Sequence, residues 1–247
     1  MKLRIDKLLV ERGLVPSRER AQAMILAGRV MVNEQKVEKS GANVEQDAEI
    51  RLLGDDLRYV GRGGLKLERA LEHWGIDPTG LTCMDVGAST GGFTDCLLQH
   101  GAAKVIAVDT GYGQIDAKLR GDARVRLLEK TNARFLEPGM VGERVQMVVM
   151  DVSFISATLV LPAVLRAAFV GESEAVRHLV VLVKPQFEVG REKVGKGGIV
   201  RDEKAQQGAV DKVQDAVKKL GGRETEVIDS PILGAEGNKE FLLYAKF

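Results

Sequence analysis

The spacing of apolar side chains changes character along the chain. Near the N-terminus, helical spacing runs from Ile5 to Gly13 and again from Ser17, a common N-cap residue, to Gly28. Short alternating runs over 29–33 and 50–53 follow, and they are typical of strands. Residues 1–57 are therefore predicted to form a small α+β domain with two helices and a β-meander.

From residue 65 onward, strand and helix patterns alternate. A helical pattern over 65–74 stops at Gly75, and helical stretches separate the later strand runs from one another. This alternation favours an α/β fold, in which helices cover both faces of a mostly parallel sheet. We expect the runs at 227–228 and 240–247 to add a terminal strand pair. The five internal strands are expected at Thr82–Val86, Val105–Asp109, Val125–Leu128, Gln146–Met150 and Leu179–Val183.

The stretch between these two patterns, 55–64, is charged, rich in glycine and without periodicity. Such a stretch is typical of a domain junction. We therefore expect one domain over residues 1–57, a short linker over 58–64, and a second domain over 65–247.

Composition narrows the class of protein. A chain of 247 residues with 45% hydrophobic content can bury a sizeable core, which excludes a disordered protein. No run approaches the roughly 20 apolar residues that a membrane helix needs, and the N-terminus lacks a signal-peptide pattern, so we expect a cytoplasmic protein. Cys83, Cys96 and three dispersed histidines fit neither a disulfide framework nor a zinc site, so we expect no metal.

Charge is unevenly distributed although the net charge is only +1. Residues 1–30 contain seven Lys or Arg side chains and three acids. This local excess has two interpretations, a surface that faces an anion or an ordinary solvated helix face.

The loop over 85–94, Asp-Val-Gly-Ala-Ser-Thr-Gly-Gly-Phe-Thr, lies between the first predicted strand of the larger domain and a helix. Glycines let a ligand approach the backbone there, and a helix N-terminus favours an anionic group. Asp109, at the end of the next strand, could accept hydrogen bonds from ribose hydroxyls. An acid, a glycine-rich turn and a second acid form the pattern of S-adenosylmethionine-dependent methyltransferases. The cofactor contacts expected from it are Asp85, Gly87, Ala88, Ser89, Gly91, Gly92 and Asp109.

Two other ligand classes compete for this loop. Ser89 stands where a dinucleotide fingerprint has a glycine that lets the backbone meet a pyrophosphate. The Gly-x-Ser-x-Gly spacing over 87–91 also fits the nucleophile elbow of serine hydrolases. A hydrolase would need a later histidine on a loop, but the last histidine, His178, directly precedes an apolar strand. The methyltransferase interpretation is therefore favoured.

A second glycine-rich stretch, 190–197, fits the first part of a phosphate-binding P-loop. Gly197 occupies the position of the Ser or Thr that binds magnesium, so we do not expect a nucleotide-hydrolysing site. The overlapping basic stretch 191–204 has two equally good interpretations, a mobile loop that faces a substrate or a solvated connector.

The N-terminal segment resembles the S-four RNA-binding domain. The resemblance rests on Arg-Ile-Asp-Lys-Leu-Leu at 4–9, Ser-Arg at 17–18 followed by Ala21, and Gly-Arg-Val-Met-Val-Asn at 28–33. It implies that basic side chains of the two helices contact RNA phosphates, which position a protein without reading bases. The contacts that it implies are Arg4, Lys7, Arg18, Arg20 and Arg29.

From Lys66 onward the sequence resembles the FtsJ-like ribose 2′-O-methyltransferases, and the whole chain resembles the TlyA or hemolysin-A family of ribosomal RNA methyltransferases. The resemblance implies a Rossmann-like fold with a seven-stranded sheet, S-adenosylmethionine as cofactor, and ribosomal RNA or a ribosomal subunit as partner, methylated on a cytidine ribose. By motif position, Asn132 is expected on the adenine side of the cofactor, although a polar turn is an equally good account. The catalytic tetrad that it implies is Lys66, Asp151, Lys184 and Glu240, and Asp151 would also border the cofactor.

The chemistry explains why such a tetrad is useful. A ribose hydroxyl is a weak nucleophile near neutral pH, so a base must take its proton as the methyl group leaves a sulfonium. A lysine can be that base when burial and a neighbouring cation lower its pKa. We expect Lys184 to be the base and Asp151 to orient it, while Lys66 and Glu240 tune charge and position the ribose. The alternative for each residue is an ordinary surface ion pair.

Two other functions stay open at this point. One is an RNA-binding ribosome-assembly factor without catalysis, against which the four matching tetrad positions argue. The other is the membrane activity that the hemolysin name suggests, for which the sequence offers neither a membrane-spanning segment nor a long amphipathic stretch free of core patterning.

Overall fold

The computed structural model describes residues 2–15, 17–53, 58–171, 175–234 and 236–247. The chain divides into two compact units, Met1–Leu57 and Arg58–Phe247, which we call the N-terminal and C-terminal units and describe separately. Within the described ranges, no helix is both long enough and apolar enough to cross a membrane.

The N-terminal unit has the expected α+β composition. Its two helices pack against each other and against two small antiparallel sheets, ordered β1-β4 and β3-β2-β5. Side chains from both helices and from β2, including Ile5, Met24 and Val30, form its buried core. Ser17 caps the second helix as predicted, because its hydroxyl accepts a hydrogen bond from the backbone N–H of Arg20. The elements are β1 (Lys2–Arg4), α1 (Ile5–Glu11), α2 (Arg18–Leu26), β2 (Val30–Val32), β3 (Gln35–Lys36), β4 (Asn43–Glu45) and β5 (Ile50–Leu52).

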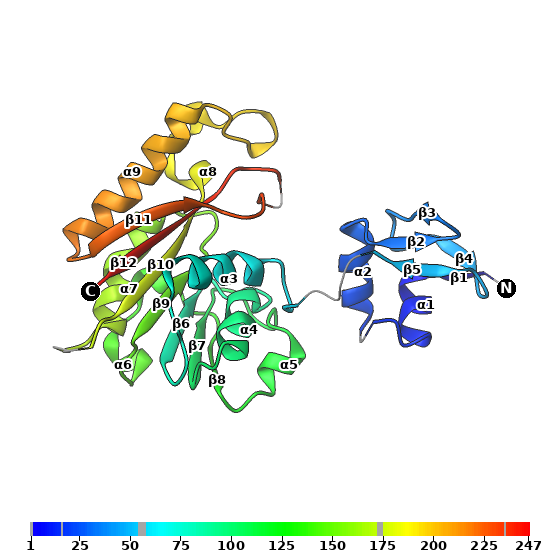
Figure 1. The fold of residues 1–247 in the computed structure, drawn as a ribbon, viewed down its shortest axis with the longest axis horizontal. Coiled ribbons are helices and arrows are strands. Elements are labelled where there is room, and N and C mark those ends of the chain that lie inside the picture. The colour runs from blue at the N-terminus through cyan, green and yellow to red at the C-terminus, as the bar shows by residue number, and fades with distance from the viewer. Residues whose placement is uncertain (1, 16, 54–57, 172–174, 235) are drawn as a thin grey trace. The chain divides into compact units, whose positions relative to one another are not determined.

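The C-terminal unit is built on a seven-stranded sheet in the order β11-β12-β10-β9-β6-β7-β8 (Figure 1). The pairs among β8, β7, β6, β9 and β10 are parallel, whereas β12 runs antiparallel to both of its neighbours. This arrangement confirms the predicted α/β fold. The strands are β6 (Thr82–Val86), β7 (Lys104–Val108), β8 (Val125–Leu128), β9 (Met147–Met150), β10 (His178–Val183), β11 (Arg223–Asp229) and β12 (Phe241–Lys246).

Helices cover both faces of the sheet. One face packs against α7 and α9, and the other packs against α3 and α4. In β9, Val148 and Met150 face the first layer while Met147 and Val149 face the second, so every side chain of this strand is buried. The helices are α3 (Gly63–Trp74), α4 (Gly92–Gln99), α5 (Ala117–Arg120), α6 (Pro138–Val141), α7 (Ala157–Ala168), α8 (Pro185–Glu188) and α9 (Glu203–Lys219).

Strand boundaries differ from the prediction mainly at the edge of the sheet. The internal strands begin or end within one residue of the expected positions. At the edge, β11 covers Arg223–Asp229 rather than only residues 227–228, because its first residues are polar and exposed and therefore give no hydrophobic signal.

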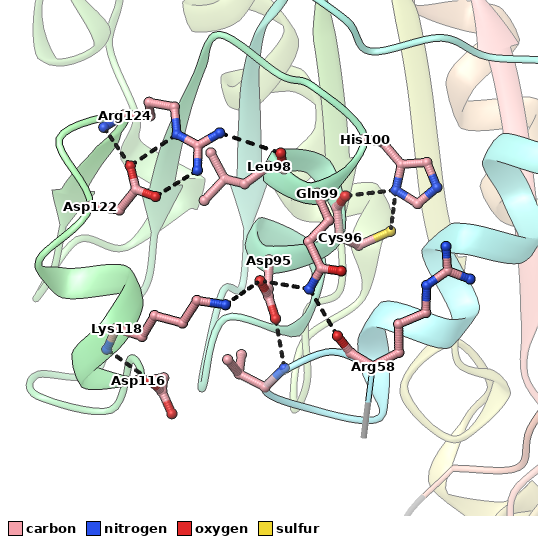
Figure 2. A network of polar contacts seen from close by, with 11 residues as sticks. Arg58, Asp95, Cys96, Leu98, Gln99, His100, Asp116, Lys118, Asp122 and Arg124 are labelled. Carbon is pink, nitrogen blue, oxygen red and sulfur yellow. Dashed lines mark hydrogen bonds and ion pairs between the residues drawn. The ribbon is translucent and has the colours of Figure 1, made fainter. Parts of the chain in front are cut away.

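The segment 58–64, which we expected to be a linker, packs against the rest of the C-terminal unit (Figure 2). The Tyr59 hydroxyl donates to Glu68 over 3.0 Å, and the Val60 N–H donates to Asp95 Oδ2 over 2.8 Å. A Cβ atom on Gly64 would stand 2.3 Å from the ring of the buried Tyr59, so this glycine is needed for close packing rather than for flexibility. Charge and glycine content had predicted a linker up to residue 64, whereas α3 already begins at Gly63.

Candidate active site

A cavity of about 310 Å³ opens where the carboxyl ends of β6, β7 and β9 meet. In α/β sheets this edge is the usual place for ligands, and the volume lies within the range for small-molecule sites. Of the residues that we expected to bind a cofactor, Gly87, Ser89, Asp109, Asn132 and Asp151 line it. Lining residues that the sequence analysis did not single out include Thr110, Gln114, Thr131, Ser153, Phe154 and Ile155.

Gly87 brings the loops after β6 and β9 into contact. Its φ is +86°, and a Cβ atom there would lie 2.3 Å from the carbonyl oxygen of Asp151. Any side chain at this position would push the two loops apart. The glycine therefore allows these two loops to meet where both line the cavity.

Asp109 holds the loops after β6 and β7 together. Its Oδ2 accepts a hydrogen bond from the Ser89 N–H over 2.8 Å, and its Oδ1 accepts one from the Gly111 N–H over 2.7 Å. Each carboxylate oxygen has a further lone pair, so the group can also accept hydrogen bonds from ribose hydroxyls in the cavity. Asn132 lines the same cavity, and its side chain accepts a hydrogen bond from the Arg134 N–H.

The other expected cofactor contacts do not line the cavity. Ala88 is buried, Gly91 packs against Leu119, and Gly92 lies against the start of α3. Asp85 is fully buried and accepts a hydrogen bond from the Thr94 hydroxyl over 2.7 Å. Its Oδ1 atom has no hydrogen-bond partner among the described residues. Asp85 thus faces the interface between the sheet and α4, where its contact with Thr94 supports the glycine-rich loop 85–94.

The four tetrad positions form two ion pairs. Lys184 Nζ lies 2.6 Å from Asp151 Oδ1, and Lys66 Nζ donates to Glu240 Oε2 over 2.5 Å. Lys66 and Glu240 are almost completely buried, which distinguishes them from the ordinary surface pair that was the alternative. The two pairs are linked through α3, because a Cβ atom on Gly63, one turn before Lys66, would lie 3.9 Å from Asp151 Oδ2.

Sheet topology explains why Asp151 and Lys184 meet. Asp151 directly follows β9, Lys184 directly follows β10, and these strands are parallel neighbours. Lys184 Nζ and Asp151 Oδ1 are close enough for an ion pair, but they are not aligned for a hydrogen bond. Lys184 instead donates a hydrogen bond to Ser153 Oγ over 2.7 Å. Sequence reasoning missed Ser153, although it lies two residues after Asp151 in the motif Met-Asp-Val-Ser-Phe.

Glu188, at the end of α8, clamps the two loops that carry this pair. Its Oε1 accepts a hydrogen bond from the Ala157 N–H over 2.6 Å, and its Oε2 accepts one from the Ser156 hydroxyl. These groups begin α7, where free N–H groups and the helix dipole favour a carboxylate. Lys212 of α9 donates to the Glu188 carbonyl oxygen over 2.8 Å and pairs with its carboxylate. The end of the β9–α7 loop (151–156) at which α7 begins is thereby fixed to α8 and α9.

Two alternative interpretations of the glycine-rich stretches can now be assessed. No described histidine lines the cavity beside Ser89, because His73, His100 and His178 contact Glu226, Cys96 and Tyr244 instead, which argues against a serine hydrolase. The stretch 190–197 follows α8 rather than a strand, so it is not a P-loop.

The continuation of that stretch is held in place by a buried amide. The Asn238 side chain accepts a hydrogen bond from the Val200 N–H and donates one to the Gly198 carbonyl.

Among the described residues, no three His, Cys, Asp or Glu side chains are grouped so that they could hold a metal ion.

The basic residues expected to contact RNA all belong to the N-terminal unit. Arg4 and Arg18 are brought together, because both donate hydrogen bonds to the buried carboxylate of Asp6. Lys7 is exposed, and Arg20 and Arg29 are partly exposed.

The strand order, the antiparallel β12 and the cavity at the strand ends define the fold of S-adenosylmethionine-dependent methyltransferases. Residues 59–247 match the FtsJ-like methyltransferase family, and residues 3–50 match the S4 domain. The chain belongs to the FtsJ-like methyltransferase family, joined to an S4 domain.

Relatives of known name match almost the whole chain. It is 44% identical to the 16S/23S rRNA (cytidine-2′-O)-methyltransferase TlyA of Mycobacterium tuberculosis, over 98% of this chain and 89% of that one. It is 41% identical to Hemolysin A of Brachyspira hyodysenteriae, over 98% and 99%. A solved structure titled "Putative hemolysin from Streptococcus thermophilus" shares 41% identity over 99% of this chain and 88% of that one, with a TM-score of 0.77. The resemblance to the TlyA or hemolysin-A family is confirmed.

The first prediction concerns Asp85. Burial raises the pKa of its carboxyl group to about 7; the hydrogen bond from Thr94 opposes this rise, and the negative charge of Asp151 adds to it. Between its ordinary pKa near 4 and about 7, the folded state keeps a proton that the unfolded state has lost. The free energy of unfolding should therefore fall as pH rises through this window, by at most about 1.4 kcal/mol per pH unit. Asp85→Asn should remove this contribution.

The measurement is urea unfolding from pH 5 to 8, followed by fluorescence of Trp74, the single tryptophan of the chain, which lies in the C-terminal unit. Asp211→Asn, on the exposed side of α9, is the control. Equal pH slopes for wild type and Asp85→Asn would contradict the assignment of the raised pKa to Asp85.

The second prediction concerns the Glu188 clamp. Glu188→Gln replaces an acceptor that faces two donors at the start of α7, so the free energy of unfolding should fall by about 1–3 kcal/mol. Turnover should fall as well, because the β9–α7 loop carries Asp151. Urea unfolding and steady-state methyl transfer test this, with the exposed Glu203→Gln as the matched control. Wild-type values of both quantities would show that the clamp is dispensable.

Proposed function

We propose that the chain binds S-adenosylmethionine in the cavity at the strand ends and methylates the ribose 2′-hydroxyl of a cytidine in ribosomal RNA. The observation that carries this proposal is the Lys184–Asp151 pair, which borders a cavity of suitable size in a methyltransferase fold. The 44% identity to a protein named for cytidine 2′-O-methylation of ribosomal RNA supports the substrate.

The residues of the cavity fit this cofactor. Gly87 leaves the backbone open where a side chain would collide with Asp151, and Asp109 offers carboxylate lone pairs for ribose hydroxyls. Asn132 and Thr131 line the same cavity, on the side that we assign to adenine. When bound, the cofactor supplies an electrophilic methyl group on a positively charged sulfur.

We assign the proton transfer to Lys184. Its amine would accept the proton that the ribose 2′-hydroxyl loses when it receives the methyl group that a bound cofactor would supply, with the sulfur as leaving group. The ammonium formed in this step lies 2.6 Å from Asp151, whose carboxylate offsets the new charge. Ser153 accepts a hydrogen bond from the same nitrogen, which fixes the direction of its remaining N–H bonds or lone pair.

Lys66 and Glu240 are assigned a positioning role. We expected Lys66 to act partly as a neighbouring cation, but its charge is offset by Glu240 within a buried pair. The pair ties α3 to the start of β12 beside the catalytic edge of the sheet. Its contribution is therefore the placement of the ribose rather than a long-range field.

RNA is the partner that the S4 domain favours. We propose that Arg4, Lys7, Arg18, Arg20 and Arg29 contact phosphates and bring ribosomal RNA, free or within a subunit, to the enzyme. A non-catalytic RNA-binding protein would have no need for the Lys184–Asp151 pair at the edge of a cofactor-sized cavity, or for a second, buried Lys66–Glu240 pair.

The third prediction tests the base. Lys184→Ala should lower methyl transfer by about 100-fold or more, because general-base catalysis typically contributes this much. Transfer of labelled methyl groups to ribosomal RNA is measured, together with cofactor binding by calorimetry and thermal unfolding, which should both persist. Lys218→Ala, at an exposed position in the last turn of α9, is the control. An active Lys184→Ala protein would remove Lys184 from the role of base.

The fourth prediction tests the cofactor site. Asp109→Ala should weaken binding of S-adenosylmethionine by about tenfold or more, the effect of losing one or two hydrogen bonds to a charged group. Calorimetry on the full chain measures the dissociation constant, and the exposed Asp211→Ala should leave it unchanged. Unaltered affinity of the Asp109 variant would place the cofactor elsewhere.

The nucleotide that is methylated can be identified directly. Mass mapping of ribosomal RNA from cells with and without the gene should show one cytidine whose ribose loses its methyl group. Unchanged RNA in both subunits would overturn the proposed activity.

A further inference from the structure

The N-terminal unit contains a buried acid among its basic residues. Asp6 lies in the first turn of α1, and its side chain is completely buried. Its carboxylate accepts four hydrogen bonds: two from Arg4, one from Arg18 Nε and one from Gln22. The Arg4 guanidinium holds the pKa of this carboxyl well below its usual range, so the group stays ionised.

The two arginines share one oxygen atom. Arg4 Nη2 and Arg18 Nε each lie 2.9 Å from Asp6 Oδ2, so the two guanidinium groups are neighbours although they come from different elements. Two such cations would repel each other without the acid between them. Both arginine side chains remain almost half exposed, at 42% and 44%.

The geometry leaves donors available on the outer side of the cluster. Arg4 Nη1 and both terminal nitrogens of Arg18 take no part in the bonds to Asp6. The three charged groups together keep one net positive charge. Planar guanidinium groups with paired donors match the oxygens of a phosphate group better than a lysine does.

We propose that Asp6 is a positioning residue for RNA binding, which holds Arg4 and Arg18 side by side so that their outer donors grip one phosphate group of the RNA backbone. This inference rests on the proposed RNA substrate and adds the residue that organises the contact. An acidic residue would thereby favour the binding of a polyanion, which its charge alone would not predict.

The test compares two acid-to-amide substitutions in the full chain. Asp6→Asn and Glu11→Gln each remove one negative charge from α1, but Glu11 is exposed and takes no part in the hydrogen bonds among Asp6, Arg4 and Arg18. Charge alone predicts tighter RNA binding by both variants. Our proposal predicts tighter or equal binding by Glu11→Gln and about tenfold weaker binding by Asp6→Asn, because a charge-assisted contact is lost.

Binding is measured by filter retention of purified small-subunit and large-subunit ribosomal RNA, separately, over a series of KCl concentrations. The slope of log K against log salt should decrease by about 0.7–0.9 in magnitude for Asp6→Asn, the effect of one lost phosphate contact. Asp6→Asn affinity equal to or tighter than that of wild type would overturn the inference alone. Failure of the wild-type protein to bind either RNA would overturn the proposed partner as well.

Because Asp6 is buried, a second variant keeps the test independent of folding. Arg18→Lys retains the charge at a half-exposed position but cannot bind Asp6 and a phosphate with the same planar group. It should weaken RNA binding severalfold. The control is Arg51→Lys, which changes an arginine of β5 that pairs with Glu34, and it should leave RNA binding unchanged. Equal affinities of these two lysine variants would contradict the proposal even if Asp6→Asn does not fold.

Discussion

The close approach of the β6 and β9 loops is the constraint on which the site depends. These strands are parallel neighbours in register, with Val86 opposite Met150, so the chain leaves both at the same level. Gly87 can lie against the Asp151 carbonyl because it has no Cβ atom and adopts a positive φ. A wider separation would move Asp151 away from the cavity floor and from Lys184. The cofactor cavity and the proposed base therefore share one backbone contact.

The Lys66–Glu240 ion pair connects this region to the start of strand β12. Lys66 and Glu240 are buried, and removing two charges from water costs free energy that good geometry must offset. Such a pair stabilises little compared with apolar packing, but it strongly disfavours any arrangement that separates its members. Together with Tyr59 and Val60, which fix the segment before α3, it determines where that helix lies beside Asp151.

The parts of this structure that the sequence reveals are those with a strong local signal. β9 and β10 are buried on both faces, so their continuous apolar runs identified them. The site candidates that directly follow these strands, Asp151 and Lys184, came from the family resemblance and not from the pattern. Asp85 was expected in the cavity because an acid before a glycine-rich turn is a good ligand, but its strand position turns it toward Thr94. Alternation along a strand determines this, and it cannot be assigned without knowing which face the next element covers.

Other residues were missed because their role is created by distant contacts. Glu188 reads as one more surface acid until α7 and α9 are packed beside it, and Asp6 reads as a helix-terminal acid until Arg4 and Arg18 converge on it. The segment 58–64 has the composition of a flexible junction, although Gly64 serves close packing against Tyr59. No local pattern distinguishes these cases.

The antiparallel strand β12 also bears on the charge balance beside α3. It inserts between β10 and β11, both of which precede it in the chain, and it delivers Glu240 to a lysine 174 positions earlier in the sequence. Bringing such distant segments together costs loop-closure entropy, which the packing of the sheet must offset. Without β12 in place, the buried Lys66 would lack its carboxylate, and an uncompensated buried charge is strongly disfavoured. The completion of the sheet and the pairing of this lysine therefore depend on the same strand.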